Sequence, residues 1–385
     1  MLKKIKIKKK ILIVTHSWPQ RQGGIYGGIQ NVAYMHAEEL AKIKEYEINV
    51  FTSKENGLNS KIPKKVNLIE GNSLFLFYKK FRISYPLLTL NTIKKLKKAV
   101  KENDIIIIND RYYISSIFAN KYAKEFNKKK ILILHTPILK YSGCLNFLYK
   151  LSNFLGKKVV KDSDILISIM KRTSDEVLKN YNIKKNSEIL YNPVNIKEFN
   201  KVKINKCKKF TVLFVGRFVK SKGVALLPSI AKGLLKEDIE LIAVGDGPEF
   251  KKIINLSKGL NNIKFLGAIT NRNKLIKLYK KSHLLLLTSE SGETFPLVLI
   301  DGFAAGIPSV STKVSPFSEI FKHDIGYFCE IGDKDNIVSS IIKLKNNNKD
   351  YKKKSKNALK FAKNELDIKI IAKKLNNIIE DLKVN

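Results

Sequence analysis

The sequence predicts an α/β protein built from two doubly wound domains in series, and three observations lead to this prediction. The chain has 385 residues and a hydrophobic content of 44%, enough to fill the cores of two ordinary domains. Short apolar runs alternate with amphipathic stretches, as expected for parallel strands buried between helices. The alternation stops once, over residues 191–209, and then resumes, which indicates a linker between two domains.

The first half contains six apolar runs with the length of strands. They are Ile11–Ser17, Tyr46–Ser53, Val66–Gly71, Asp104–Asn109, Lys130–Thr136 and Asp164–Ile169. The periodicity between them predicts helices near Gly28–Ile43, Tyr85–Lys101, Ile114–Phe126, Leu145–Lys161 and Arg172–Tyr181.

The second half repeats the pattern with five strands and five helices. The expected strands are Phe210–Gly216, Ile239–Gly245, Ile263–Gly267, His283–Ser289 and Pro308–Thr312. The expected helices lie near Gly223–Lys236, Glu249–Ser257, Asn271–Lys280, Pro296–Ala305 and Asp335–Asn346. A Lys-rich helical stretch follows Asp350, and the apolar spacing of Ile368–Leu382 predicts that this segment docks on another surface. Ligands of two such domains are expected in the cleft that their strand ends face.

Composition limits the classes of function. The formal net charge of +39 could reflect nucleic acid, an anionic membrane or acidic substrates as partners. Only six of the 73 basic residues are arginines, whereas readers of nucleic acid rely on Arg for bidentate contacts. We therefore expect no nucleic-acid partner, and we attribute the lysines to composition bias or to attraction by an anionic surface.

The termini and cysteines favour a cytoplasmic protein. No apolar run approaches the roughly 18 residues of a membrane span. The basic N-terminus precedes an apolar run, Ile11–Val14, that is shorter than the roughly 7–15 residues of a signal-peptide core. Cys144, Cys207 and Cys329 lie far apart without metal-ligand spacing, so we interpret them as reduced structural residues and expect no metal site.

Two acids bracket the start of an apolar helix near residue 296. Glu293 precedes the helix and Asp301 lies inside it, where an unpartnered carboxylate is costly. Pro296 suits a first helical position. Free backbone N–H groups over Thr294, Phe295 and Leu297 can hold a phosphate, and Asp301 can accept hydrogen bonds from a vicinal diol such as a ribose. The alternative is that Glu293 caps the helix and Asp301 is a satisfied buried group.

A basic turn follows the first strand of the second half. In Gly216-Arg217-Phe218-Val219-Lys220-Ser221-Lys222-Gly223, the cations Arg217 and Lys222 flank the mouth of the next helix. Two cations beside a helix N-terminus suit a diphosphate, although the spacing is not that of a P-loop. The alternative is a pair of solvated surface cations.

Three further motifs follow expected strands. Gly27 and Gly28 open a helix and allow backbone N–H groups to approach an anion, or they form a plain turn. Gly245 and Gly247 form a tight turn that suits close approach of a nucleoside. His135 ends a strand, where it could hydrogen-bond a sugar, steady a departing phosphate, or be structural.

Taken together, the motifs resemble the retaining glycosyltransferases of family 4 with the GT-B fold, also described as glycosyl transferases group 1. Residues 293–301 look like the E-x7-E motif, with Asp301 in place of the second Glu. Residues 216–223 are similar to the G-R-x4-K-G element, residues 245–248 to the G-x-G-P turn, and residues 192–199 to the interdomain signature N-G-V-D-x-x-x-F.

The resemblance implies an N-terminal acceptor-binding domain over residues 1–195 and a nucleotide-sugar-binding domain over 206–363. The helix over residues 364–385 returns to the N-terminal domain. It also implies catalysis without a divalent metal or another cofactor.

The resemblance implies a role for each motif as well. Arg217 and Lys222 neutralise the diphosphate, Glu293 holds hydroxyls of the donor sugar, and Asp301 holds the ribose. Gly28 approaches the phosphates, and His135 lies near the donor sugar and the leaving group.

The function that follows is transfer of a hexosyl or related sugar, with retention, from a nucleotide diphosphate sugar to a glycan or lipid-linked acceptor. Cell-surface polysaccharide or glycolipid synthesis is the expected setting. Segments 74–82 and 145–158 mix apolar residues with lysines and could lie on the inner membrane face, or could bury an apolar face with solvated lysines. The alternatives are a nucleotide-sugar epimerase on the same fold and a basic nucleic-acid or surface-binding protein without catalysis.

Overall fold

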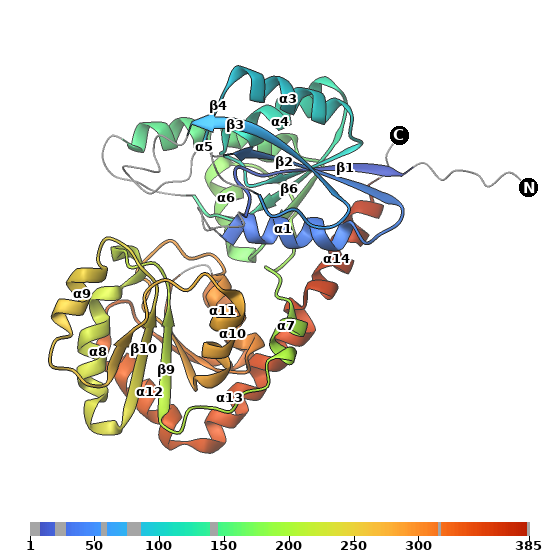
Figure 1. Ribbon diagram of the computed structural model, residues 1–385. Coiled ribbons are helices and arrows are strands. Elements are labelled where there is room, and N and C mark those ends of the chain that lie inside the picture. Colours follow the sequence, from blue (N-terminus) through green and yellow to red (C-terminus); the bar gives the residue numbers. More distant parts are fainter. Residues whose placement is uncertain are drawn as a thin grey trace, which may run out of the picture. The chain divides into compact units, whose positions relative to one another are not determined.

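The structure is a computed structural model, and it describes residues 8–19, 28–54, 60–74, 86–138, 145–314 and 317–382. The chain forms two compact units. Unit 1 comprises Met1–Tyr191 together with Ile368–Asn385, and unit 2 comprises Asn192–Asp367. Each unit is a parallel sheet covered by helices, as the alternating apolar runs predict (Figure 1).

Unit 1 contains an eight-stranded sheet in the order β4-β3-β2-β1-β5-β6-β7-β8. Every pair is parallel except the antiparallel pair β3–β4. The chain order reverses between β1 and β5, which makes their carboxyl ends a topological switch point. The strands are β1 (Lys9–Val14), β2 (Tyr46–Lys54), β3 (Val66–Leu74), β4 (Leu87–Leu88), β5 (Ile105–Asn109), β6 (Lys129–Leu134), β7 (Ile165–Ser168) and β8 (Glu188–Ile189).

Helices cover both faces of this sheet. In Figure 1, α3, α4 and α5 lie over one face, and α1 lies beside α14 over the other. The strands are buried on both faces, with Leu12, Ile106 and Leu132 inaccessible to solvent. The helices are α1 (Gly28–Leu40), α3 (Leu90–Lys101), α4 (Ile114–Glu125), α5 (Leu145–Asp162), α6 (Lys171–Tyr181) and α14 (Ile368–Glu380).

Unit 2 contains a six-stranded, fully parallel sheet in the order β11-β10-β9-β12-β13-β14. Its chain order reverses between β9 and β12, so the unit repeats the switch-point arrangement of unit 1. The strands are β9 (Phe210–Val215), β10 (Ile239–Val244), β11 (Ile263–Phe265), β12 (Leu284–Leu287), β13 (Ser309–Thr312) and β14 (Gly326–Cys329).

The helices of unit 2 include α11, which begins four residues after Glu293. All but its first two residues are buried, as its apolar sequence predicts. The helices are α7 (Ile196–Lys201), α8 (Leu227–Leu234), α9 (Phe250–Leu256), α10 (Arg272–Lys281), α11 (Leu297–Ala304), α12 (Lys334–Asn346) and α13 (Asn348–Phe361). Single turns η1 (Lys220–Lys222) and η2 (Val224–Leu226) precede α8.

The C-terminal helix α14 belongs to unit 1, although unit 2 separates it from the rest of that unit in the sequence. Its apolar stripe, Ile368, Ile371, Leu375 and Ile379, is buried, and the helix packs against α1 (Figure 1). At its end, the Tyr46 hydroxyl donates to the Glu380 carboxylate.

The two segments that join the units pair with each other inside unit 2. Val194 bridges Asp367, and the Val194 N–H donates to the Leu366 carbonyl at 2.8 Å. The Asn192 amide also donates to the Phe295 carbonyl at 2.9 Å. These contacts are the reason that unit 2 begins before residue 206 and ends after residue 363.

Local structure departs from the sequence prediction in a few places. The helix expected from Tyr85 begins at Leu90, because the Thr89 hydroxyl caps it by accepting from the Thr92 N–H. Pro296 lies one residue before the first turn of α11 rather than in it. The predicted linker contains the short helix α7, and the edge strand β14 was not predicted, because Gly326–Cys329 is buried at only one position and contains no run of aliphatic residues.

Within the described residues, no helix is both long enough and apolar enough to cross a membrane. Cys207 and Cys329 are free thiols. Cys144, Gly27 and residues 75–82 of the first Lys-rich apolar segment lie outside the described part of the chain.

Candidate active site

The switch point of unit 2 brings two of the predicted motifs together. The loop after β9 carries Arg217 and Lys222, and the loop after β12 carries Glu293. The Lys222 ammonium donates to Glu293 Oε1, and the Ser289 hydroxyl donates to the same oxygen at 2.7 Å. Glu293 is buried, and Oε2 has no hydrogen-bond partner among the described residues. One oxygen of this carboxylate is therefore held in place, while the other remains able to accept from a ligand.

Hydrogen bonds to backbone carbonyls fix the two loops against each other. The Thr288 hydroxyl donates to the Lys222 carbonyl at 2.9 Å, and the Glu290 N–H donates to the Ser221 carbonyl at 2.9 Å. Gly223 has φ +61°, and a Cβ atom there would lie 1.8 Å from the Thr288 carbonyl oxygen. Only glycine allows this approach. Gly223, the residue after Lys222, therefore allows Lys222 to lie beside Glu293.

The glycine turns after β9 and β10 also meet. A Cβ atom on Gly245 would lie 1.8 Å from the Gly216 carbonyl oxygen, and one on Gly247 would lie 2.5 Å from the Phe218 carbonyl oxygen. Both residues have positive φ, +140° and +157°. The Phe218 N–H donates to the Asp246 carbonyl at 2.9 Å. The predicted donor-binding glycines thus form one tightly packed edge beside the Lys222 loop.

The segment between Glu293 and α11 is largely buried. Thr294, Phe295 and Pro296 are buried and Leu297 is partly buried. The N–H groups of Leu297 and Val298 lie in the first turn, where an α-helix supplies no acceptor. These N–H groups lie four and five residues after Glu293, as expected for an anion-binding helix start.

Asp301 makes a contact that the sequence did not predict. Its two oxygens accept from both terminal nitrogens of Arg272, with Oδ1 at 2.7 Å, and Arg272 Nε also donates to Glu198 at 3.1 Å. Burial raises the pKa of the Asp301 carboxyl, and the adjacent Arg272 guanidinium opposes that rise. A ribose bound by Asp301 would have to share the carboxylate with Arg272.

Arg217, Gly28 and Gly27 complete the predicted set. Arg217 is exposed, and its guanidinium has no partner among the residues that the structure describes. Gly28 is the exposed first residue of α1, and Gly27 lies outside the described residues. Arg217 is therefore free to meet an anion.

A second polar cluster occupies the switch point of unit 1. In this cluster, His16 follows β1, Asn109 is the last residue of β5, and His135 follows β6. His135 Nε2 lies 3.1 Å from Asn109 Oδ1. The His16 ring stacks on Tyr113 with centroids 3.7 Å apart. Burial, with His36 and His16 nearby, lowers the pKa of His135 to about 3. The imidazole is therefore neutral near pH 7 and carries no charge that could steady a departing phosphate.

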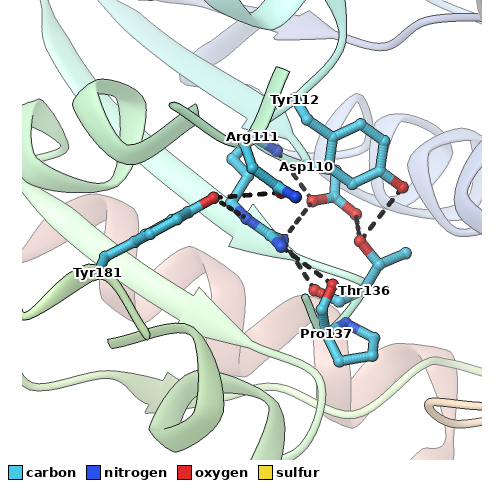
Figure 2. Close-up of polar contacts among 7 residues, drawn as sticks. Asp110, Arg111, Tyr112, Thr136, Pro137 and Tyr181 are labelled. Atoms are coloured by element: carbon cyan, nitrogen blue, oxygen red, sulfur yellow. Dashed lines mark hydrogen bonds and ion pairs between the residues drawn. The ribbon is translucent and has the colours of Figure 1, made fainter. Parts of the chain in front are cut away.

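Asp110 and Arg111, directly after β5, form a buried ion pair that was not predicted from the sequence (Figure 2). The Arg111 guanidinium donates to Asp110 Oδ1 at 3.2 Å, to the Thr136 carbonyl at 2.8 Å and to the Pro137 carbonyl at 3.0 Å. The Thr136 hydroxyl donates to Asp110 Oδ2 at 2.8 Å. Burial raises the pKa of the Asp110 carboxyl against the opposing effect of Arg111. The signal available in the sequence was a charged pair directly after β5, whose first four residues are isoleucines.

No group of three or more His, Cys, Asp and Glu side chains is arranged to hold a metal ion within the described residues. Other site residues left no signal in the sequence. Ser289, Thr288 and Arg272 contact the predicted residues across separations of 4 to 66 positions, which no local pattern encodes.

Comparisons with known proteins identify the family of the chain. Residues 26–198 match the family model for Glycosyltransferase Family 4, and residues 195–361 match the model for Glycosyl transferases group 1. The N-acetyl-alpha-D-glucosaminyl L-malate synthase of Bacillus anthracis is 27% identical over 68% of this chain and 70% of its own length. An uncharacterized glycosyltransferase of Methanocaldococcus jannaschii is 27% identical over 92% of this chain and 95% of its own length.

Solved structures show the same fold. Anabaena HepE in complex with UDP superposes with a TM-score of 0.75 at 15% identity, covering 97% of this chain and all of that one. The sucrose-phosphate synthase of Thermosynechococcus elongatus gives a TM-score of 0.78 at 16% identity, over 97% of this chain and 99% of that one. The two family models together span residues 26–361, and the chain belongs to the family 4 glycosyltransferases with the GT-B fold.

Proposed function

We propose that this glycosyltransferase moves a sugar, with retention of configuration, from a nucleoside diphosphate sugar to a hydroxyl of a glycan or lipid-linked acceptor. The observation that carries the proposal is the Lys222–Glu293 pair at the switch point of unit 2. A cation for the diphosphate and an acceptor for sugar hydroxyls lie side by side at the edge where such folds bind nucleotides.

The relatives support a nucleotide-sugar donor. HepE was solved with UDP, with UDP and glucose, and with UDP-glucose. The B. anthracis relative is named for transfer of an N-acetylglucosaminyl group to malate, and one structural neighbour acts in lipopolysaccharide biosynthesis. We infer that a nucleoside diphosphate sugar is the donor here as well, and that cell-surface polysaccharide or glycolipid synthesis uses the product.

In the proposed reaction, the acceptor oxygen bonds to the anomeric carbon as the bond to the diphosphate oxygen breaks. The acceptor attacks the same face of the donor sugar from which the diphosphate departs, and the acceptor proton passes to the leaving phosphate. Lys222, Arg217 and the start of α11 stabilise the growing phosphate charge. Glu293 Oε2 accepts from donor-sugar hydroxyls, and Gly28 approaches the phosphates. Because two cations supply the charge, we propose that the reaction needs no divalent metal.

We also propose that unit 1 attaches to the inner face of an anionic membrane through α5. Leu151, Phe154 and Leu155 are 47%, 73% and 37% exposed, and the exposed Lys150 and Lys158 flank them. The apolar side chains of this helix are therefore partly presented to solvent rather than all turned inward. An exposed apolar surface rimmed by lysines suits an anionic lipid interface.

Vesicle flotation tests this attachment. We expect the wild type to float with phosphatidylglycerol vesicles at low salt, and Phe154→Ser to lose most of that binding. Leu256→Ser, which removes a 57% exposed leucine of unit 2, is the matched control and should float like the wild type. Equal flotation of all three proteins, or none by the wild type, would reject the role of α5.

A thermal-shift screen of nucleotide sugars, followed by NMR of the products, tests the function itself. We expect one nucleotide sugar to stabilise the protein and to give a glycoside with the anomeric configuration of the donor, also in the presence of EDTA. Isomerisation of the donor without transfer would identify an epimerase. Tight binding of RNA, with no response to any nucleotide sugar, would favour a nucleic-acid-binding protein.

A further inference from the structure

The carboxyl ends of three neighbouring strands in unit 1 carry a continuous chain of hydrogen bonds. Asn109, the last residue of β5, donates through Nδ2 to the carbonyl of Val14, the last residue of β1, at 3.3 Å. On the other side, Asn109 Oδ1 lies 3.1 Å from His135 Nε2, just after β6. Since β1, β5 and β6 are adjacent in the sheet, the chain runs straight across its edge.

The direction of these bonds determines the tautomer of His135. A backbone carbonyl can only accept, so the Asn109 atom that faces Val14 must be the amide nitrogen. The atom that faces His135 is then the amide oxygen, which also can only accept. His135 Nε2 must therefore carry the proton, and Nδ1 keeps its lone pair.

The ion pair that follows Asn109 fixes the backbone on which the His135 ring is mounted. Asp110 accepts from the Thr136 hydroxyl at 2.8 Å and from the Arg111 backbone N–H at 2.9 Å. Arg111 holds the carbonyls of Thr136 and Pro137 (Figure 2). Gly156 of α5 leaves room for Arg111, since a Cβ atom there would lie 3.2 Å from Arg111 Cγ. Three consecutive residues thus hold both the ring and the main chain.

We propose that Asn109 is a positioning residue that holds His135 as the Nε2–H tautomer, so that Nδ1 accepts a hydrogen bond from a substrate hydroxyl. Asp110 and Arg111 hold the residues that directly follow His135 in place. His135 then acts neither as a cation toward phosphate nor as a proton donor through Nδ1. The identity of the substrate in this inference rests on the proposed function, whereas the tautomer of His135 does not depend on it.

The charged and titratable surroundings agree with a neutral ring. The groups that act on His135 are the buried imidazoles of His36 and His16, and the Asp110 carboxylate lies beside the next residue, where it accepts from the Thr136 hydroxyl. The Arg111 guanidinium pairs with that carboxylate, which offsets its negative charge. Burial lowers the pKa of His135 to about 3, far below the pH at which most enzymes work.

Long-range proton–nitrogen NMR of the protein labelled on histidine nitrogens reads the tautomer directly. The chain contains only five histidines, so His135→Gln assigns the signal by its loss. We expect one protonated Nε2 and one unprotonated Nδ1, unchanged from pH 8 to pH 5. A protonated Nδ1, or titration of the ring within that range, would overturn the proposal.

Variants separate positioning from general stability. Asn109→Leu removes the acceptor for Nε2–H and should allow the ring to exchange tautomers, while Asn109→Asp restores an acceptor and should restore the Nε2–H signal. Tyr181→Phe removes the bond from Arg111 Nε at 3.1 Å without touching His135, and should leave the spectrum unchanged. An Nε2–H signal that persists in Asn109→Leu would show that Asn109 does not set the tautomer.

Activity is measured with a nucleotide sugar that stabilises the protein in the screen. We expect Asn109→Leu to lower kcat at least tenfold, with UDP binding within twofold of the wild type, and Asn109→Asp to recover part of kcat. A kcat equal to that of the wild type would overturn the role of Nδ1. If no nucleotide sugar reacts at all, the proposed function fails, whereas the NMR result still decides the tautomer.

Discussion

Glu293 and Lys222 form the most informative contact of the site at the scale of single residues. Only one carboxylate oxygen of Glu293 is used by the protein, since Lys222 and Ser289 both donate to Oε1. The ion pair brings Lys222 to the edge of the β9–β12 switch point and holds it beside the Glu293 carboxylate. The pair therefore holds both side chains in place and leaves Glu293 Oε2 able to accept from a ligand.

We predict that Glu293→Ala weakens transition-state binding by about 1.5–3 kcal/mol, the usual range for hydrogen bonds to a charged group. That loss corresponds to roughly a ten- to hundredfold fall in kcat/KM. Steady-state kinetics measure it. Glu290→Ala, three residues earlier in the same loop, serves as the control and should stay near the wild type. A similar fall in both variants would point to general damage to the loop.

Asp301 gives a second prediction at this scale. Because both of its oxygens hold Arg272, Asp301→Ala removes the acceptors of both terminal nitrogens of a partly buried guanidinium and leaves only the bond from Nε to Glu198. We expect this variant to lose about 1–3 kcal/mol of unfolding free energy, as for a lost charged hydrogen-bond partner.

Urea denaturation measures that loss of stability, and isothermal titration separates it from ribose binding. If Asp301 also binds the ribose, the ratio of affinities for UDP and 2′-deoxy-UDP will move toward one in the variant. An unchanged ratio, together with the loss of stability, would assign Asp301 to Arg272 alone. Unchanged stability would contradict the role of the Arg272 contact.

At the scale of elements, the β9 and β12 loops depend on a glycine for their close approach. Gly223→Ala adds a Cβ atom 1.8 Å from the Thr288 carbonyl and also places alanine at φ +61°. We expect both lower stability and weaker nucleotide binding, because Lys222 moves with the loop. Thermal unfolding and titration of UDP measure the two effects.

Gly332→Ala is the matched control for this prediction. It has φ +84° and no atom within 4 Å of the added Cβ, so it carries the backbone strain of about 1–2 kcal/mol without the clash. Gly223→Ala should therefore be clearly the more destabilised of the two. Equal losses of stability in the two variants would show that the clash with the Thr288 carbonyl does not lower the free energy of unfolding.

Most of the regular structure could be predicted from the sequence, and the reason is visible in the elements themselves. Strands such as Ile105–Asn109, four isoleucines followed by one asparagine, are buried at every position because both faces are covered, and their apolar run can be recognised without tertiary information. The short helix Ile196–Lys201 and the edge strand Gly326–Cys329 carry too little periodicity to predict.

The candidate site could be predicted only in part. Arg217, Lys222 and Glu293 follow strands whose carboxyl ends meet at the switch point, so their grouping follows from the topology. The partners that orient the predicted residues, Ser289 for Glu293, Arg272 for Asp301 and Asn109 for His135, depend on side-chain packing between separate segments. No local pattern encodes such contacts.

At the scale of the whole molecule, buried histidines make stability depend on pH. Burial lowers the pKa values of His16 and His135 to about 3 and that of His36 to about 4, from 6.5 in the unfolded chain. Below pH 6.5 the unfolded chain therefore binds more protons than the folded protein, and the free energy of unfolding falls as the pH falls.

We predict that these histidines leave the midpoint of thermal unfolding nearly unchanged above pH 7. Between pH 6.5 and pH 4 they should cause the midpoint to fall. His36→Gln should flatten the slope, because each such imidazole contributes up to about 1.4 kcal/mol per pH unit. Scanning calorimetry over this range measures the slope. A slope in His36→Gln as steep as that of the wild type would contradict the assignment of His36 as a buried neutral group.

Titration of nucleoside diphosphates tests directly whether the β9–β12 edge of unit 2 holds the donor diphosphate. We predict that UDP or GDP binds the wild type and that Lys222→Ala binds it at least tenfold more weakly. Lys220→Ala removes an exposed lysine from the same turn and should bind like the wild type. Binding of neither nucleotide, or equal affinity in the two variants, would contradict the account.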